Sequence, residues 1–198
     1  MWGRTRSWTN GVGYASSAAT NGSGMVISEE PHLVEVTDQF GNTTTIAVVL
    51  DGTTALFFDH SGSNWLPRAY YQEQLTHNMF GQEYVLTDTS GDQIRFYDSA
   101  TGSLADQFKS YTDPGGNTIS VMSHNMAGEI TEMQRSYPVG TVTTTESLLY
   151  TYPMSLLGTP PVSNVTLRRQ VNGGAWTIFR QVNYTITTAS RRTATPAT

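Results

Sequence analysis

Apolar and polar residues alternate with a period of two along much of this chain, and helical periodicity is hard to find. Such alternation is typical of strands that bury one face, and the clusters of Asp, Asn and Gly that interrupt it are typical of turns. The predicted strands cover residues 33–37, 45–50, 53–58, 83–87, 93–97, 165–171 and 175–184. We therefore predict an all-β fold of antiparallel β-hairpins.

Individual turns differ in how clearly the sequence marks them. Asp51-Gly52 is a strong signal for a two-residue hairpin turn, because both positions tolerate positive φ. Residues 172–174 (NGG) predict another hairpin near the end of the chain. The segment 65–77 is aromatic and lacks a clear period, so a loop, a short helix and an irregular strand all remain open.

One turn pattern recurs with the form D-x-x-G-[ND]. Its copies begin at Asp38, Asp88 and Asp113, and looser copies begin at Asp59 and Asn125. Asp at the first position of a β-turn accepts backbone N–H bonds, and Gly accepts the left-handed geometry at the exit. Repetition of this kind indicates a degenerate repeat that stacks to bury one continuous core. We expect the Asp113 carboxylate to accept such bonds and Gly116 to have positive φ.

Composition narrows the function classes. Charged residues are 14% of the 198, well below the roughly 25% of typical soluble domains, and Lys109 is the only lysine. A net charge of −5 argues against nucleic-acid binding, which needs clustered Lys and Arg. Cysteine is absent, so thiolate chemistry and disulfides are excluded. No apolar run approaches the ~20 residues of a membrane helix, and residues 1–17 lack the apolar core of a signal peptide.

Residue types associated with catalysis or metal binding occur without the spacing that such sites need. The histidines, at 32, 60, 77 and 124, show no ligand spacing. Asp59-His60-Ser61 holds the residue types of a catalytic triad, but sequence neighbours rarely converge, so turn chemistry is the favoured interpretation. We predict no catalytic, cofactor-binding or metal-binding residue and no cofactor.

Three further sets of residues each have a structural and a functional interpretation. Glu29-Glu30 is expected to be a solvated loop rather than an acid/base pair. The carboxylates of Asp88, Asp92 and Asp98 miss the EF-hand spacing, which leaves an adventitious calcium site as a minor alternative. The tryptophans and ten tyrosines are expected to pack in the core, with a sugar-binding groove as the alternative.

Part of the chain resembles the Rhs/YD-repeat family, in the form found in planctomycete bacteria. That family's unit is Tyr-Asp, a short gap, Gly-x-Leu, a spacer and Thr-Asp-Pro-x-Gly. The matching residues are Tyr97, Asp98, Gly102, Leu104, Thr112, Asp113, Pro114 and Gly116. Both gaps are longer than usual, and Ser103 stands where the family has Arg. Segments 128–136 and 165–170 resemble other Rhs segments, so the match covers about residues 83–186 and is faint before them.

The resemblance implies a structural role. Family members wind β-hairpin repeats into a hollow shell, so this chain would be an open, curved section of wall. We divide it into an N-terminal β-rich region (1–82), a YD-repeat-like region (83–186) and a disordered tail (187–198). The expected function is a non-enzymatic scaffold, and the alternative is a carbohydrate- or surface-binding β module. Expected partners are the remainder of a larger parent protein, or neighbouring copies at exposed strand edges, with a glycan as a further candidate. The resemblance also implies an extracellular or cell-surface location.

The resemblance stops at Thr185. Family units would continue with Tyr-Tyr-Asp-Gly, where this chain reads ITTA. With permissive codon choices, residues 185–190 can be encoded by ACT ATT ACG ACG GCG AG, and the same letters read from the last base of the first codon encode Tyr-Tyr-Asp-Gly-Glu. We therefore expect a frameshift near Thr185, and residues 187–198 have no large apolar side chain to bury. The nucleotide sequence tests this, because a codon other than ACT at Thr185 would contradict it.

Overall fold

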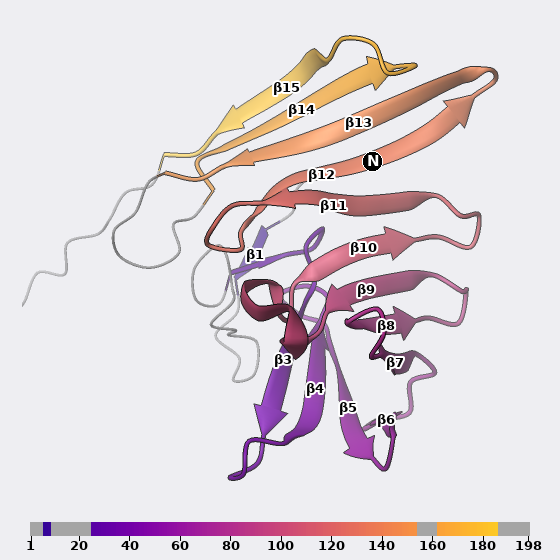
Figure 1. Ribbon diagram of the computed structural model, residues 1–198, viewed down its shortest axis with the longest axis vertical. Helices are drawn as coiled ribbons and strands as arrows, with labels where there is room; N and C mark the ends of the chain where they lie inside the picture. Colours follow the sequence, from indigo (N-terminus) through magenta and orange to yellow (C-terminus); the bar gives the residue numbers. More distant parts are fainter. Residues whose placement is uncertain (1–5, 9–24, 154–161, 186–198) are drawn as a thin grey trace, which may run out of the picture.

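The computed structural model describes residues 6–8, 25–153 and 162–185 (Figure 1). Strands make up 59% of these residues and helix 4%, which confirms the predicted all-β class. The elements are β1 (Arg6–Trp8), β2 (Met25–Ile27), β3 (His32–Thr37), β4 (Thr43–Val49), β5 (Ala55–Ser61), β6 (Asn64–Pro67), β7 (Gln74–Asn78), β8 (Glu83–Thr87), β9 (Gln93–Tyr97), the 3-10 helix η1 (Ser99–Leu104), β10 (Phe108–Thr112), β11 (Thr118–His124), β12 (Ile130–Val139), β13 (Val142–Thr151), β14 (Asn164–Val171) and β15 (Thr177–Asn183).

Thirteen strands, β3 to β15, form one antiparallel sheet, and each pairs with the strands before and after it in sequence. β1 and β2 pair separately with each other. The large sheet is not closed into a barrel, so β3 and β15 are its outer strands. The predicted open sheet of antiparallel hairpins is therefore confirmed.

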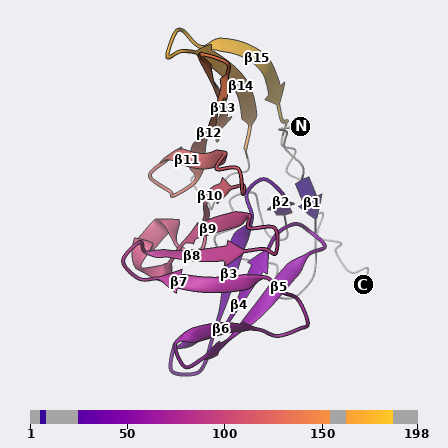
Figure 2. The same cartoon turned by 90° about the vertical axis from the view of Figure 1, so that its right-hand side faces the viewer.

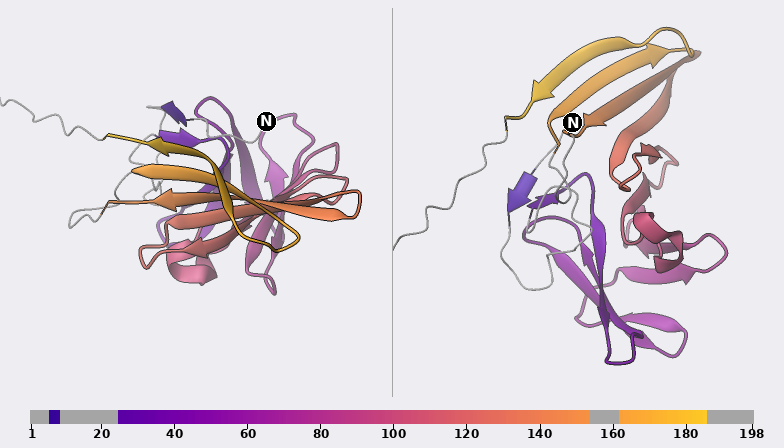
Figure 3. Two further views of the ribbon diagram at one scale, coloured as in Figure 1. Left: turned by 90° about the horizontal axis from the view of Figure 1, so that it is seen from above. Right: turned by 60° about the vertical axis from the view of Figure 1, so that its left-hand side comes forward.

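The sheet curves strongly, so that its two ends approach the same concave side (Figures 2 and 3). A hydrogen bond from Leu33 N to Asp106 O (2.8 Å) ties β3 to the connection between η1 and β10. The first strand of the sheet thus lies against its middle. β4 becomes covered on both faces, since the consecutive residues Ile46, Ala47 and Val48 are all buried.

Two apolar clusters form the core. The first lies in β3–β9 and contains Leu33, Ile46, Val48, Phe58, Trp65, Leu75, Tyr84, Leu86 and Phe96. The second lies in β10–β14 and the approach to β14, and contains Phe108, Ile130, Met133, Leu148, Tyr150, Val162 and Val165. Burial of apolar side chains at about 25 cal/mol per Å² is the main force that holds the hairpins together.

The repeated turn has one geometry at four positions, starting at Asp38, Asp88, Asp113 and Asn125. In each, the first residue bonds through its backbone N–H to the carbonyl four residues on, and its carbonyl accepts from the glycine N–H. Its side-chain oxygen accepts the backbone N–H of the fifth residue at 2.8–3.0 Å. The φ values of the four glycines are 84°, 94°, 83° and 84°. This confirms the predicted geometry at Asp113 and Gly116, and extends it to the looser copy at Asn125.

The other looser copy, at Asp59, was predicted wrongly. Asp59 lies within β5, and its carboxylate accepts hydrogen bonds from Arg68 and Thr45 instead of capping a turn. The turn that follows joins Ser61 to its partner Asn64, and Gly62 lies inside it with φ 64°. The sequence form D-x-x-G is met there by coincidence.

The hairpin at Asp51-Gly52 exists, but its loop is longer than predicted. The last strand pair is Val49 with Ala55, so five residues rather than two form the connection. The Asp51 carboxylate accepts the backbone N–H groups of Thr53 and Thr54 at 2.7 and 2.9 Å. This side-chain cap stabilises a wider loop than the Asp-Gly pair alone favours.

The remaining expectations have different outcomes. The segment 65–77 contains most of β6 and the start of β7, so the irregular-strand alternative is the one observed. The hairpin at 172–174 is confirmed between β14 and β15, and the turn at 88–91 joins β8 to β9 at the predicted bounds. The expected disordered tail at 187–198 lies outside the described residues.

Candidate functional site

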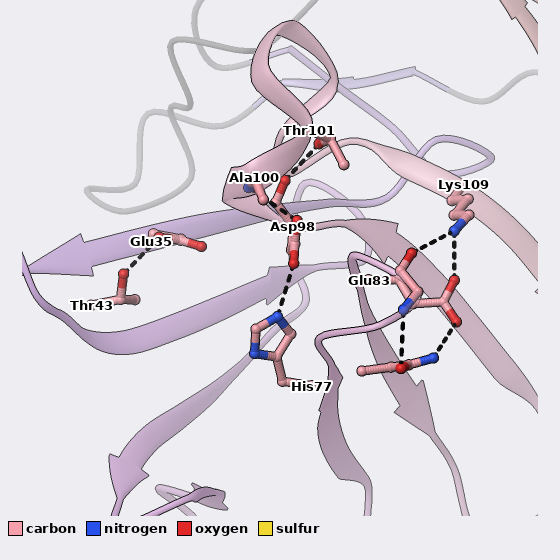
Figure 4. A network of polar contacts seen from close by, with 10 residues as sticks. Glu35, Thr43, His77, Glu83, Asp98, Ala100, Thr101 and Lys109 are labelled. Atoms are coloured by element: carbon pink, nitrogen blue, oxygen red, sulfur yellow. Dashed lines mark hydrogen bonds and ion pairs between the residues drawn. The ribbon is translucent and has the colours of Figure 1, made fainter.

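Asp98, the second residue of the Tyr97-Asp98 pair, belongs to a partly buried set of polar contacts (Figure 4). Asp98 follows β9, and its side chain is 6% exposed. One carboxylate oxygen accepts the backbone N–H of Ala100 at 3.0 Å and so caps η1. The other contacts His77 Nε2 on β7 at 3.0 Å. His77 in turn stacks on the Tyr84 ring of β8, with centroids 4.4 Å apart.

A second ion pair crosses the same strands beside Tyr97. Lys109 on β10 donates to Glu83 on β8 at 2.7 Å and lies 5.3 Å from the centre of the Tyr97 ring between them. Tyr97 is half-buried in β9, as the sequence predicted. We call the set Asp98, His77, Glu83 and Lys109 the Asp98 network. It joins β7, β8, β10 and η1 around β9, and its charged groups are each matched by a group of opposite charge or by backbone N–H.

A pair of acidic side chains lies where β3 meets the middle of the sheet. Asp106 has positive φ (67°), and the charge of Glu35 on β3 acts on its carboxyl. Burial, reinforced by the Glu35 charge, raises the pKa of Asp106 to about 7. Glu35 also accepts a hydrogen bond from Thr43 Oγ1 at 2.7 Å. The same place holds the Leu33–Asp106 backbone bond that curls the sheet.

We expect Asp106→Asn to change how stability depends on pH. Because the raised pKa means that the folded state holds a proton which the unfolded chain releases, wild-type stability should fall as pH rises from about 4 to about 7. Asparagine tolerates positive φ and cannot ionise. Above pH ~7 the variant should be more stable than wild type by about 1–3 kcal/mol, and the gap should close near pH ~4. Urea unfolding across this range measures it.

Asp38→Asn is the control for that experiment. Hydrogen bonds from Asn42 lower the pKa of Asp38, so its contribution is present above its usual pKa and is lost as pH falls. The stability difference of this variant should therefore have the opposite pH trend. A constant difference between Asp106→Asn and wild type over the whole range would contradict the prediction.

Charged residues also form a ladder across β12, β13 and β14. Arg135, Glu146 and Arg169 lie directly opposite one another on these strands. Glu146 is 4% exposed and accepts two hydrogen bonds from each arginine, at 2.5–3.0 Å. Beside this ladder, Arg168, the residue before Arg169 on β14, donates to Glu132 at 2.8 Å. The ladder fixes the register of the long C-terminal strands.

The four histidines lie apart. His60 stacks on Trp65 at 4.7 Å, and burial lowers the pKa of His124 at the end of β11. His77 belongs to the network above, and His32 begins β3. Among the described residues no three His, Cys, Asp or Glu side chains form a group suited to a metal ion.

The candidate triad does not assemble. Asp59 is paired with Arg68 at 2.6 Å, whereas His60, the next residue on the strand, points to the opposite face and stacks on Trp65. Two of the three calcium candidates stay together. Asp88 and Asp92 lie in one turn, where Ser90 Oγ contacts both carboxylates, whereas Asp98 lies at the other end of β9.

The expectation for Glu29-Glu30 was wrong at Glu30, which is 7% exposed. Ser28 and Glu29 form a tight turn in which Glu30 N donates to Ile27 O at 2.9 Å. The turn places Glu30 opposite Ile27, which is itself buried. A charged pair before proline resembles a loop in sequence, but the neighbouring strand covers it.

The tryptophans, which were expected to pack in the core with a sugar-binding groove as the alternative, lie apart from one another. Trp65 belongs to the first core cluster, and Trp176 lies under the Arg168 guanidinium at 4.1 Å. Trp2 lies outside the described residues. Aromatic residues border open grooves: Tyr111 and Tyr137, on β10 and β12, line one, and Trp65 and Tyr71 line another beside β6 and β7. For the two tyrosines, alternation within each strand was the only signal that could have found them.

The sequence matches no family model, and neither a curated protein nor a solved structure matches the chain. The resemblance to the Rhs/YD-repeat family therefore rests on its motifs and stays a prediction. In the described part of the chain, no helix has both the length and the apolar character of a transmembrane span.

Proposed function

We propose that this chain is a non-enzymatic structural scaffold, a wall segment of an open β-shell of the Rhs/YD-repeat kind. The observation that carries the proposal is the single meander of thirteen strands, in which β15, among the described residues, has a strand partner on one side only. A meander of this kind can be extended by further hairpins at its outer strands, and its topology does not limit the number of strands.

The motif residues support the proposal through the roles they take. Asp98 caps η1, Gly102 has φ 67° within η1, and Asp113 with Gly116 closes a hairpin. All four act in turns or packing. A repeat whose recurring residues set turns is suited to building a wall, because turns determine strand length and register.

The partners of a wall segment would join at its edges, either as the remainder of a larger parent protein or as neighbouring copies. β15 is the clearest candidate edge. It is seven residues long, and Ile178 and Phe179 are 65% and 57% exposed on it. Among the described residues it pairs on one side only, with β14. An apolar edge strand of this length is a template for further pairing.

We therefore expect the isolated chain to self-associate, and light scattering over a concentration series measures this. The double variant Ile178→Lys/Phe179→Lys should shift it toward monomer, because charged side chains discourage edge pairing. Phe80→Lys is the matched control, since Phe80 is fully exposed in the β7–β8 connection and should leave association unchanged. A wild-type chain that stays monomeric at high concentration would contradict the proposal.

A further inference from the structure

A groove of about 390 Å³ opens on the sheet over β10, β11 and β12, beside the turn at 113–117. Its lining includes Tyr111, Asp113, Asn117, Ile119, Arg135 and Tyr137. The three strands lie side by side in the middle of the sheet (Figure 1). The volume lies within the roughly 300–1,000 Å³ that small-molecule sites occupy.

The strand register explains why the surface is hollow here. Tyr111, Ile119 and Arg135 are directly opposite one another on adjacent strands, so they form one row across the sheet. Ile119 has the shortest side chain of the row and lies between two long ones. An apolar floor is thus bordered by the Tyr111 ring on one side and by Tyr137, two residues along β12, on the other.

Both tyrosine rings are held in place without any ligand. Tyr111 donates its hydroxyl to Asp92 at 2.5 Å, which ties the ring to the neighbouring turn at 88–92. Tyr137 donates to Glu146 at 3.3 Å and lies beneath the Arg135 guanidinium, 5.6 Å from the ring centre. Rings fixed in advance lose little conformational entropy on binding, which favours recognition of a ligand.

The polar groups at the rim are hydrogen-bonding and mostly charge-compensated. Arg135 is ion-paired with Glu146 at 2.6 Å and shares that carboxylate with Arg169, so its charge is matched in part. The Asp113 carboxylate accepts from the Asn117 side chain at 2.7 Å and from its backbone N–H. The Asp113 carboxylate would repel an anionic ligand, and the Arg135 guanidinium would repel a cationic one. A neutral ligand with many hydroxyl groups fits this rim best, because hydroxyls both donate and accept.

We propose that this groove binds a neutral saccharide of mono- or disaccharide size. The C–H face of a pyranose ring would lie over Ile119 against the faces of Tyr111 and Tyr137, and its hydroxyls would bond to Asp113 and Asn117 at the rim. The site is independent of the scaffold proposal, since it needs only β10–β12 and not the sheet edges. A wall that carries it would hold a glycan on its surface.

The test titrates the full chain with cellobiose, maltose and N,N′-diacetylchitobiose, and follows the tyrosine ring signals by NMR. We expect at least one of the three to shift the signals of Tyr111 and Tyr137. Tyr137→Ala should weaken binding by about tenfold, the loss of one aromatic contact, whereas Tyr137→Phe keeps the ring and should bind nearly as wild type. Tyr70→Ala is the control, because Tyr70 is a fully exposed tyrosine outside the groove.

Each outcome decides the proposal. Tyr137→Phe controls for misfolding, since it removes only a hydroxyl. A further variant, Ile119→Trp, places a larger side chain on the floor of the groove and should abolish binding. No response to any of the three disaccharides would overturn the proposal. Binding that survives both Tyr137→Ala and Ile119→Trp would also overturn it, as would a response to a sulfated disaccharide alone.

Discussion

Replacing Glu146 by glutamine is expected to destabilise the protein by about 3 kcal/mol. The Glu146 carboxylate is 6% exposed and is the shared partner of Arg135 and Arg169. Glutamine keeps the shape but loses the negative charge, so two guanidinium groups would face each other across β13 without compensation. Removing one partner of a buried ion pair costs more than the pair contributes, because the remaining charge stays desolvated.

The pH dependence of this effect has a definite sign. Burial by itself raises the pKa of Glu146, but hydrogen bonds from Arg169 and Arg135 outweigh it and leave the pKa below its usual value. The stabilisation is therefore present above the usual glutamate pKa and is lost as pH falls. The difference between Glu146→Gln and wild type should shrink below pH ~4.

Urea unfolding of Glu146→Gln measures the loss, and Asp59→Asn is the matched control. The Asp59–Arg68 pair joins β5 to the residue that follows β6 at 2.6 Å, but its side chains are 45% and 53% exposed. Exposed pairs contribute about 0–1 kcal/mol, so Asp59→Asn should cost far less. Equal losses in the two variants would show that burial does not determine the energetics of the ladder.

Gly128→Ala should cost more than Gly116→Ala although both glycines occupy the same position of the same turn. Both have positive φ, 84° and 83°, so alanine at either suffers a backbone strain of about 1–2 kcal/mol. An added Cβ at Gly116 would meet nothing within 4 Å, whereas at Gly128 it would lie 2.5 Å from the Ser103 carbonyl oxygen. That oxygen belongs to the backbone of η1, so no side-chain rotation can move it away from the new Cβ.

The expected cost of Gly128→Ala is about 2–5 kcal/mol, the sum of the strain and the displacement of η1. At about 2–4 °C per kcal/mol for a chain of this size, the melting temperature should fall by roughly 5–15 °C. Differential scanning calorimetry of the two variants compares them directly. Equal melting temperatures would mean that η1 yields freely, and would contradict the close approach of Ser103.

Much of the fold could be predicted because its information is local. Period-two alternation located the strands 83–87 and 93–97 at their observed bounds, and the turn at Asp88 followed from its own residue types. A carboxylate that accepts N–H bonds two and four residues on, and a glycine at positive φ, need no distant partner. The segment 65–77 stayed ambiguous because its strands are short and their pairing depends on neighbouring strands.

The candidate sites could be predicted far less well, since they depend on which strands become neighbours. His77 and Asp98 are 21 residues apart and meet only because β7 pairs with β8 and β8 with β9. Tyr111 and Tyr137 share a groove only through the register of β10, β11 and β12.

By itself, the sequence determined the fold class, several hairpins and the recurring turn, because alternation and turn residues act over a few positions. The tertiary structure decided the burial of Glu30, the ion pairing of Asp59 and the raised pKa of Asp106. Each of these depends on the curvature of the sheet or on the strand that comes to lie alongside. Side-chain environment is a property of neighbours distant in sequence, and one chain read alone does not specify them.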